Sequence, residues 1–513
     1  MSFGPPPSMS QPPPAAETHE RKPGRKVRKA LTALLAVVLV AGLGAGGWLL
    51  WGGGDGKSAS QDGKGATEAQ GPLDVRETVE RQPASTVGEM AFRFSVDDMN
   101  PGERVEMPGM WATDRVLAKG INKTLVGMRV GTDIEPGEEE WKLGLDGPIC
   151  GYTRHVTGDN RTAVLFRAND WAEDAYCNQV AFVDLDDGRM VWEARFPTSP
   201  SGLQSALDAG QDRPSVTLAH DTVAVTWGGG TTAYGMAKGE RRWSTTATDP
   251  CQDMGAAGGR ALIVRQKCWS GDKSVPDTSY QHIGYKVRKV DPATGRTLWT
   301  YSAAEGIRDL KVASTEPAVL AVAGGDIEIT DLLSLDDQGR DRATISLRNG
   351  AYVADCSYTD YLVIDDCPTI AVGADQIFIR SKDQLEKQVS NWIIGFDLET
   401  GDTTKKFDSG PGSLLQPVRM SGGRLLALRL SEDHIAPNAL VALDPGTDEQ
   451  IPYFYFGLPA EAETMTLMNE NDIVVQNGRI FFGRKSADGP SGEQKKQWLY
   501  LVLGIGSSAA EKP

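Results

Sequence analysis

Short apolar stretches separated by polar residues and glycines recur along most of the chain. Each has about the five or six residues of an ordinary β-strand, and many are rich in valine, isoleucine and leucine. They include residues 180–185, 261–265, 285–290, 318–323, 376–380, 424–429 and 479–483. Only residues 203–209 and 382–390 look helical, and both are expected to decorate loops. The pattern predicts an all-β chain.

A turn phrase recurs between these strands. In four copies a glycine lies four residues after the first position and a tryptophan lies eight residues after it. The first positions are Asp133, Asp184, Gly235 and Asp291, the glycines are Gly137, Gly188, Gly239 and Gly295, and the tryptophans are Trp141, Trp192, Trp243 and Trp299. Successive tryptophans are 51, 51 and 56 residues apart. A repeat of about 40–50 residues with strands on either side is typical of a β-propeller, in which each repeat forms one blade.

The turn phrase has a direct physical basis. An aspartate side chain accepts hydrogen bonds from backbone amides two residues further on, and glycine adopts the left-handed conformation that closes a hairpin. The tryptophan on the following strand is expected to fill the gap between neighbouring sheets, so we interpret it as packing between blades and not as a binding surface. Weaker copies follow at Asp336, at Asp397 with Gly401, and at Asp444.

The repeats predict an eight-bladed β-propeller over residues 91–505. The last unit, which starts at residues 479–483, lacks one strand before the chain ends. Residues 91–95, just before the first unit, have the pattern of a strand. We expect them to pair with the last unit and close the ring, because closure removes both exposed sheet edges.

Residues 30–51 are apolar and contain no charged side chain. As a helix they would rise about 33 Å, which matches the hydrocarbon core of about 30 Å in a bilayer. The first 29 residues carry six basic and two acidic side chains, whereas the whole chain has a net charge of −16. The positive-inside rule therefore predicts a single-pass signal anchor with a cytoplasmic N-terminus and an exported, acidic body. A cleaved signal peptide is the alternative, although its apolar region is usually about 7–15 residues long.

Three further segments have the composition of irregular chain. Residues 1–29 are rich in proline and basic residues and predict a disordered cytoplasmic tail. Residues 52–90 are rich in glycine and polar residues and predict a flexible stalk. Residues 506–513 are expected to form a disordered C-terminus.

The six cysteines all lie on the exported side of the apolar segment. They fall into three near pairs, Cys150 with Cys177, Cys251 with Cys268, and Cys356 with Cys367. An even number in an oxidising compartment predicts disulfides, and pairing within each near pair is favoured. Zinc ligation is the alternative, but no C-x-x-C spacing exists and the five histidines are scattered.

The turn phrase is best preserved as Asp291, Thr294, Gly295 and Trp299. In this form it resembles the repeat of the quinoprotein (PQQ-like) β-propeller family, over roughly residues 91–505. That family includes PQQ-dependent alcohol dehydrogenases, outer-membrane assembly lipoproteins and sensor domains of membrane kinases. The resemblance implies a quinone, a calcium ion, a catalytic aspartate and a disulfide between adjacent cysteines only for the dehydrogenases, and this chain has no Cys-Cys pair. The chain is similar to the signal-anchored propellers of Gram-positive bacterial envelopes.

No enzyme motif is complete in the sequence, so we predict no catalytic residue, no metal site and no cofactor, with PQQ and calcium left as open alternatives. The negative charge argues against a nucleic-acid partner. We expect a membrane-anchored, extracytoplasmic module that binds a protein, peptide or glycan partner in the cell envelope. A sensor or co-receptor that signals through the helix, and a degenerate PQQ-dependent dehydrogenase, are the alternatives.

Overall fold

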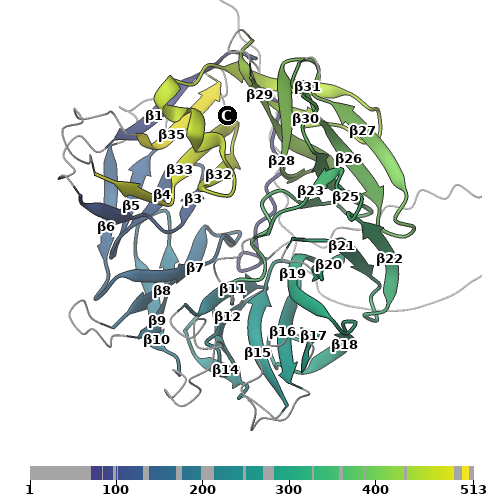
Figure 1. Ribbon diagram of the computed structural model, residues 1–513. Coiled ribbons are helices and arrows are strands. Elements are labelled where there is room, and N and C mark those ends of the chain that lie inside the picture. The colour runs from purple at the N-terminus through teal and green to yellow at the C-terminus, as the bar shows by residue number, and fades with distance from the viewer. Residues whose placement is uncertain are drawn as a thin grey trace, which may run out of the picture. The chain divides into compact units, whose positions relative to one another are not determined.

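The computed structural model contains eight antiparallel sheets arranged in a ring (Figure 1). The structure describes residues 71–83, 85–95, 100, 102–130, 138–168, 176–197, 213–246, 250–269, 282–325, 328–356, 362–385, 388–432, 436–489 and 500–507. We number the sheets as blades 1 to 8 in chain order. The prediction of an eight-bladed β-propeller is confirmed.

Blades 1 to 4 each contain four strands that are consecutive in sequence. Blades 1 and 2 consist of β3 (Met110–Ala112), β4 (Val116–Ile121), β5 (Thr124–Arg129), β6 (Glu139–Gly144), β7 (Ile149–Tyr152), β8 (Arg161–Arg167), β9 (Cys177–Asp184) and β10 (Met190–Arg195). Blades 3 and 4 consist of β11 (Ser215–Ala219), β12 (Thr222–Thr226), β13 (Thr231–Gly235), β14 (Arg241–Ser244), β15 (Cys251–Ala257), β16 (Leu262–Trp269), β17 (Ile283–Val290) and β18 (Thr297–Ser302).

Blades 5 to 8 follow the same plan with two changes, an interrupted first strand in blade 6 and a borrowed last strand in blade 8. Blades 5 and 6 consist of β19 (Ile307–Thr315), β20 (Ala318–Gly324), β21 (Asp331–Leu335), β22 (Asp341–Ser346), β23 (Tyr352–Val353), β24 (Ala371–Val372), β25 (Gln376–Ser381), β26 (Trp392–Asp397) and β27 (Thr403–Asp408). Blades 7 and 8 consist of β28 (Ser413–Ser421), β29 (Arg424–Ser431), β30 (Asn438–Leu443), β31 (Gln450–Phe456), β32 (Asn471–Gln476), β33 (Arg479–Arg484), β35 (Tyr500–Ser507) and β1 (Gly88–Ser95). The 3-10 helix η3 (Ala460–Thr466) precedes blade 8, and β2 (Arg104–Glu106) pairs with β34 (Ser486–Asp488).

The first strands of neighbouring blades contact one another, so they line the axis of the ring, and the fourth strands lie at the rim (Figure 1). Blade 3 shows why the inner strands are continuously apolar. Val223 and Val225 pack into a cluster with blade 2, whereas Ala224 between them packs into a cluster with blade 4. Because both faces of the sheet are covered, β12 is buried along its whole length.

The chain closes its own ring. β1 pairs antiparallel with β35, from Gly88 opposite Ser507 to Phe94 opposite Val502. The prediction that an N-terminal strand completes the last blade is therefore confirmed, although that strand begins at Gly88 and not at residue 91.

Three sequence-based boundaries need correction. The predicted stalk over residues 52–90 is wrong at its C-terminal end, because the described residues from 71 onward are held to the propeller by hydrogen bonds. The propeller also extends past residue 505, since β35 ends at Ser507. Residues 382–390 are not helical where they are described, because Gln384 and Ser390 form an antiparallel bridge. The helix expected at residues 203–209 lies outside the described residues.

The predicted tail, the apolar segment at residues 30–51 and the first part of the stalk all lie outside the described residues, as do residues 508–513. In the part of the chain that is described, no helix is long and apolar enough to cross a membrane. The single-pass anchor stays a prediction from the sequence.

Candidate functional site

The tryptophans of the turn phrase lie at the junctions between blades. Trp192, on the rim strand of blade 2, packs against the turn of blade 3, and its Nε1 donates to the carbonyl of Met236 at 2.8 Å. Trp243 donates in the same way to the carbonyl of Pro292 in blade 4, at 2.8 Å. Equivalent ring contacts join Trp141 to Gly188 and Trp299 to Gly339. These contacts hold one blade to the next, as the packing interpretation requires.

The turn residues explain why each indole fits. Gly295 has a left-handed φ of +71°, and a Cβ added there would lie 2.7 Å from the ring of Trp243. Asp291 Oδ1 accepts hydrogen bonds from the backbone amides of Ala293 and Thr294. In the weaker copy, Asp397 accepts from Glu399 and Thr400, and the hydrogen bonds from Thr400 and Glu399 lower the pKa of Asp397. Asp184 and Gly239 occupy the corresponding turns of blades 2 and 3, whereas Asp133 and Gly137 lie outside the described residues.

Blade 6 contains a feature that the sequence pattern does not reveal. Its first strand is split, since β23 and β24 both pair with β25, with Val353 opposite Arg380 and Ala371 opposite Phe378. The described residues 354–356 and 362–370 lie outside the sheet, between these two short strands. The disulfide between Cys356 and Cys367 joins the two ends of this excursion, which we call the axial loop. The other two predicted disulfides, Cys150–Cys177 and Cys251–Cys268, are also confirmed.

The axial loop crosses the centre of the ring, because it contacts the inner strands of several other blades. The backbone amide of Val312 in blade 5 donates to the carbonyl of Ile364 at 2.7 Å. Leu362 and Ile364 are fully buried, and they lie against Gly255 of blade 4, where a Cβ would clash with Ile364. Thr217 of blade 3 donates to Asp365 at 3.3 Å.

Charged side chains fasten the axial loop to blade 2. Arg154 forms an ion pair with Asp366 at 2.6 Å, and His155 lies 3.8 Å from Asp365. Burial opposes the charge on Arg154, but Asp366, Tyr152, Asp472 and Asp365 together outweigh burial and raise the pKa of Arg154. Burial lowers the pKa of His155 and raises the pKa of Asp365. The Arg154 side chain is still 39% exposed, so this part of the axis keeps some contact with water.

A second buried ion pair connects blades 1 and 8. Lys119 Nζ lies 2.9 Å from Asp472 Oδ2, and both side chains are almost fully buried. Burial lowers the pKa of Lys119. Burial also works against ionisation of Asp472, but Lys119 and neighbouring cations hold its pKa below the ordinary value. The Tyr152 hydroxyl donates to the same carboxylate at 3.4 Å. The cations and carboxylates around the axis are thus paired with one another.

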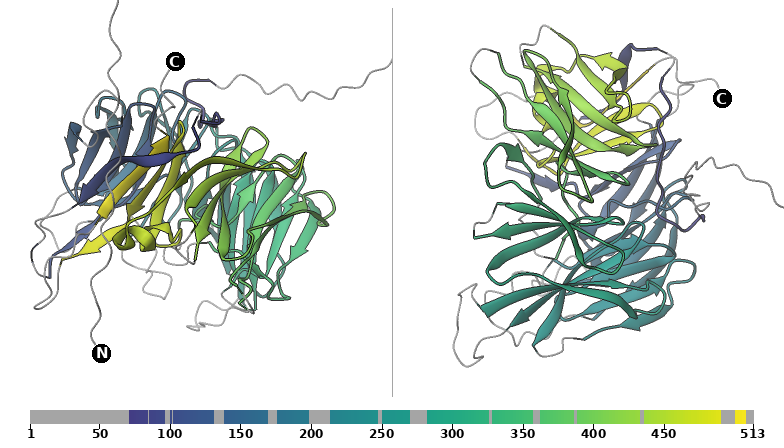
Figure 2. Two further views of the ribbon diagram at one scale, coloured as in Figure 1. Left: turned by 90° about the horizontal axis from the view of Figure 1, so that it is seen from above. Right: turned by 90° about the vertical axis from the view of Figure 1, so that its right-hand side faces the viewer.

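One end of the axis is covered by residues 71–87, which we call the strap. Its partners are the turns between the first and second strands of several blades. Arg76 donates to the carbonyl of Ala112 at 2.7 Å, and Thr78 donates to Gln476 at 3.0 Å. The buried Glu80 pairs with Arg419 at 2.8 Å. In Figure 2 the dark purple start of the described chain lies on one side of the ring and η3 lies on the other.

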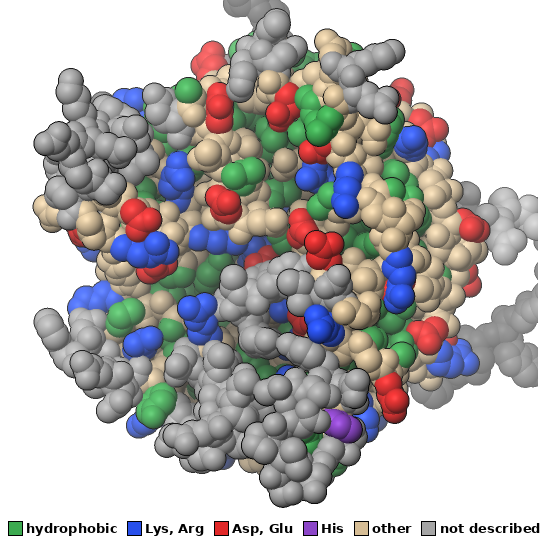
Figure 3. Space-filling view, viewed as in Figure 1, with side chains coloured by type: hydrophobic (Ala, Val, Ile, Leu, Met, Phe, Trp, Pro, Cys, Tyr) green, Lys and Arg blue, Asp and Glu red, His purple; other side chains and the backbone are tan. Residues whose placement is uncertain are grey.

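The opposite end, which we call the mouth, contains a hollow of about 150 Å³. Figure 3 shows this face of the molecule, with acidic and basic side chains interspersed around its centre. The hollow is lined by Asp355, Thr369, Arg380, Gln416, Pro417, Leu467, Met468, Asn469 and Glu470. A wider hollow of about 460 Å³ lies on blade 1 and is lined by Ile121, Asn122, Lys123, Thr124, Val126, Lys142 and Pro148.

The described residues do not fit the quinone and calcium ion of the dehydrogenases. Described residues of the axial loop lie buried across the centre of the ring, and the cations Lys119 and Arg154 there are already paired with carboxylates of the chain. The mouth hollow of about 150 Å³ falls below the range of about 300–1,000 Å³ for small-molecule sites. The wider hollow has no carboxylate among its lining residues to hold calcium. Within the described ranges, no group of three or more His, Cys, Asp and Glu side chains has the geometry of a metal site.

Eight blades with recurring aspartate–glycine turns, and with tryptophans docked at the four junctions from blade 1 to blade 5, define a PQQ-like β-propeller. The chain belongs to the PQQ_2 family, whose model is described as outer membrane protein assembly factor BamB and matches residues 177–451. That range runs from the third strand of blade 2 into the last strand of blade 7. No curated protein sequence matches the chain.

Several solved structures are distantly similar to this chain. BamB from Moraxella catarrhalis is 11% identical with a TM-score of 0.40, and the match covers 79% of this chain and 98% of that one. The quinohemoprotein alcohol dehydrogenase ADHIIG from Pseudomonas putida HK5 is 10% identical with a TM-score of 0.43, covering 86% and 79%. The β-propeller domain of Cps50 (Swd1) from Myceliophteria thermophila is 11% identical with a TM-score of 0.35, covering 64% and 94%.

Sequence reasoning found the turns, the tryptophans and the cysteine pairs but missed the axial loop and the strap. Asp365 and Asp366 stand between two cysteines and have the local pattern of an exposed loop. One available signal was the unequal spacing of the turns, since 61 residues separate Asp336 from Asp397, against 51 between Asp184 and Gly235.

Proposed function

We propose that this chain is a membrane-anchored, extracytoplasmic propeller that acts as a binding scaffold for a protein partner in the cell envelope. The apolar segment at residues 30–51, with a cluster of basic residues on its N-terminal side, supports the anchor and the export of the propeller. The family description as an assembly factor supports a role in contacts with other proteins.

The observation that carries this proposal is that a loop of the chain lies across its own axis and that the strap covers one end of it. The axial loop lies across the centre, and Glu80 and Arg419 hold the strap over one end through a buried ion pair. Because residues of the chain itself lie across the axis, we expect contacts with a partner to fall on the outer surfaces. The mouth combines the half-exposed Leu467 with a hollow of side-chain size, and both features suit contact with a protein.

Photo-crosslinking in intact cells tests this proposal. A photoreactive amino acid replaces Leu467 at the mouth, and in a separate variant it replaces Leu298 on the rim strand β18. Leu467 and Leu298 are similarly exposed, 44% and 48%, so a neighbouring protein could reach the photoreactive group about equally well at either position. We expect a discrete protein adduct from position 467 and none of the same mass from position 298.

Two outcomes would count against the scaffold. One is the absence of any protein adduct from position 467 when the full chain is present at its normal level. The other is an identical set of adducts from positions 467 and 298, which would indicate non-specific contact.

A further inference from the structure

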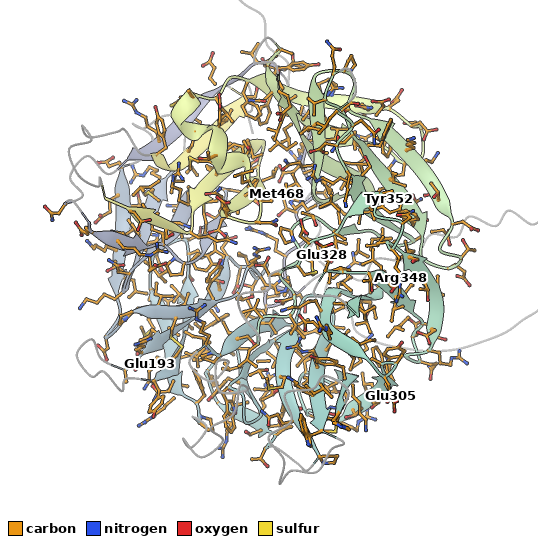
Figure 4. The ribbon with its side chains drawn as sticks, in the orientation of Figure 1. Glu193, Glu305, Glu328, Arg348, Tyr352 and Met468 are labelled. Atoms are coloured by element: carbon orange, nitrogen blue, oxygen red, sulfur yellow. A yellow bond between two sulfur atoms is a disulfide. The ribbon has the colours of Figure 1, made fainter. Side chains whose placement is uncertain are left out.

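The walls of the mouth hollow indicate what kind of side chain it takes. Pro417 and Met468 form a buried apolar surface, and Leu467 extends it to the outside with 44% of its side chain exposed. Figure 4 labels Met468 beside the centre of the ring. A surface of this kind suits the aliphatic stem of a long side chain, which buries its methylene groups and keeps its polar end near water.

Most of the charged groups around the hollow already have a partner, among them Lys485, whose Nζ donates to the Asn469 carbonyl at 3.3 Å. Arg380 donates to Asp383 at 2.8 Å, so its charge is already compensated. Glu470 lies close enough to Arg484 for their charges to interact. The backbone of Asp355 is hydrogen-bonded to Thr369, but among the described residues its carboxylate accepts only a long hydrogen bond of 3.4 Å from the Asn469 amide, and no described Lys, Arg or His lies within ion-pair distance of it.

The unpaired carboxylate of Asp355 therefore stands beside an apolar wall in a hollow that holds one side chain. A cationic head group would form a charge-assisted hydrogen bond with this carboxylate, and such bonds are about twice as strong as neutral ones. An acidic side chain would meet Asp355 and Glu470 and be repelled.

We propose that the mouth hollow binds a lysine or arginine side chain presented by a protein partner. Leu467 and Met468 contact its aliphatic stem, and the Asp355 carboxylate accepts a hydrogen bond from its cationic head. This inference rests on the proposed scaffold function and names the chemistry by which the partner is recognised.

Nuclear magnetic resonance of the methionine methyl groups provides the test. The full chain is prepared in detergent micelles with ¹³C-methyl methionine, and the Met468 signal is assigned with the Met468→Leu variant. The probes are Nα-acetyl-lysine methylamide and the uncharged Nα-acetyl-norleucine methylamide, which has the same four-carbon stem. We expect a saturable shift of the Met468 signal with the lysine probe and binding of the norleucine probe that is about tenfold weaker or more.

Variants locate the interaction. Asp355→Asn is expected to weaken binding of the lysine probe about tenfold or more, since the charged acceptor is lost. Asp337→Asn, on an exposed turn of blade 5, is the matched control and should leave binding unchanged. Arg380→Gln should leave binding as tight or tighter, because it frees the Asp383 carboxylate.

The opposite pattern would overturn the inference. Equal shifts from both probes, no shift from the lysine probe, or a shift from Nα-acetyl-glutamate methylamide that Arg380→Gln abolishes would each contradict a basic ligand. The two proposals can fail separately. The crosslinked adduct at position 467 requires only that a partner protein binds at the mouth, whereas the lysine probe tests whether the side chain that this partner presents is basic.

Discussion

The two halves of the ring are fastened in different ways. From blade 1 to blade 5, each junction contains a tryptophan that packs on the glycine of the next turn. From blade 5 onward, no tryptophan among the described residues packs on a turn glycine in this way. Ala343 and the carbonyl of Thr344 lie against Gly401, and Lys405 forms an ion pair with Asp448 at 2.8 Å.

The comparison shows that the indole acts as a spacer as well as a contact. At Gly401 an added Cβ would lie 3.2 Å from the Thr344 carbonyl, so without a tryptophan the turn packs directly on the neighbouring strand. The second half gains other connections instead. The strap is anchored by Glu80 to Arg419 and Gly478, and the axial loop starts from blade 6.

The largest expected effect comes from removing a buried tryptophan. Trp299 is 8% exposed and packs against Gly339 of blade 5. We expect Trp299→Ala to lower the free energy of unfolding by about 3–5 kcal/mol, because the turn cannot close the space left behind. Chemical denaturation of the full chain in detergent micelles, followed by circular dichroism, measures it. A loss below 1 kcal/mol would mean that the indoles do not hold the first half together.

The next effect tests the second half. Glu80 accepts hydrogen bonds from Arg419 and from the backbone amide of Gly478 in a buried site. Glu80→Gln keeps the shape but leaves the guanidinium without a counter-charge, so we expect a loss of about 3 kcal/mol. The same denaturation measurement applies, with Glu77→Gln at an exposed strap position as control. Equal, small losses for both variants would show that the strap does not stabilise the ring.

Two glycine substitutions compare the halves directly. Gly295→Ala and Gly401→Ala both place alanine at a left-handed φ, of +71° and +77°, which costs about 1–2 kcal/mol. Only the alanine at 295 also overlaps an indole, so we expect it to cost about 1–3 kcal/mol more. Thermal or chemical unfolding of the two variants side by side measures the difference. Equal costs would contradict the role of Trp243 as a fitted spacer.

The smallest effect concerns the ion pair of blades 6 and 7. Asp448 is largely exposed, so the pair with Lys405 is screened by water. We expect Lys405→Met to change the free energy of unfolding by less than about 1 kcal/mol. A larger loss of unfolding free energy would indicate that blades 5 to 8 depend on this ion pair as blades 1 to 5 depend on their tryptophans.

The sequence predicted what is local and repeated. Each turn is specified within nine residues, so the blades, the tryptophan positions and the near cysteine pairs followed from pattern alone. The seventh turn shows the limit of this reasoning, because its left-handed residue is Asp448 with a φ of +63° and not the nearby Gly446. A polar turn residue tolerates that conformation, so glycine alone was an incomplete guide.

The axial loop and the strap could not be predicted because their partners are distant in sequence. Arg154 meets Asp366, and Glu80 meets Arg419, across more than half of the ring's chain. The backbone groups of both segments form hydrogen bonds with several different blades. Neither segment is a regular strand in a sheet, so neither has the repeating apolar pattern by which the strands were predicted. The mouth hollow was missed for the same reason, as it combines residues of three blades.

A titration with quinone and calcium tests most directly whether this propeller works through its outer surface and not through its axis. The full chain in detergent micelles is mixed with PQQ at increasing concentration in the presence of calcium, and tryptophan fluorescence and visible absorbance of the dialysed protein are recorded. We expect no saturable quenching and a colourless protein, because the axial loop lies across the centre of the ring. Uptake of one quinone per chain that depends on calcium would contradict it.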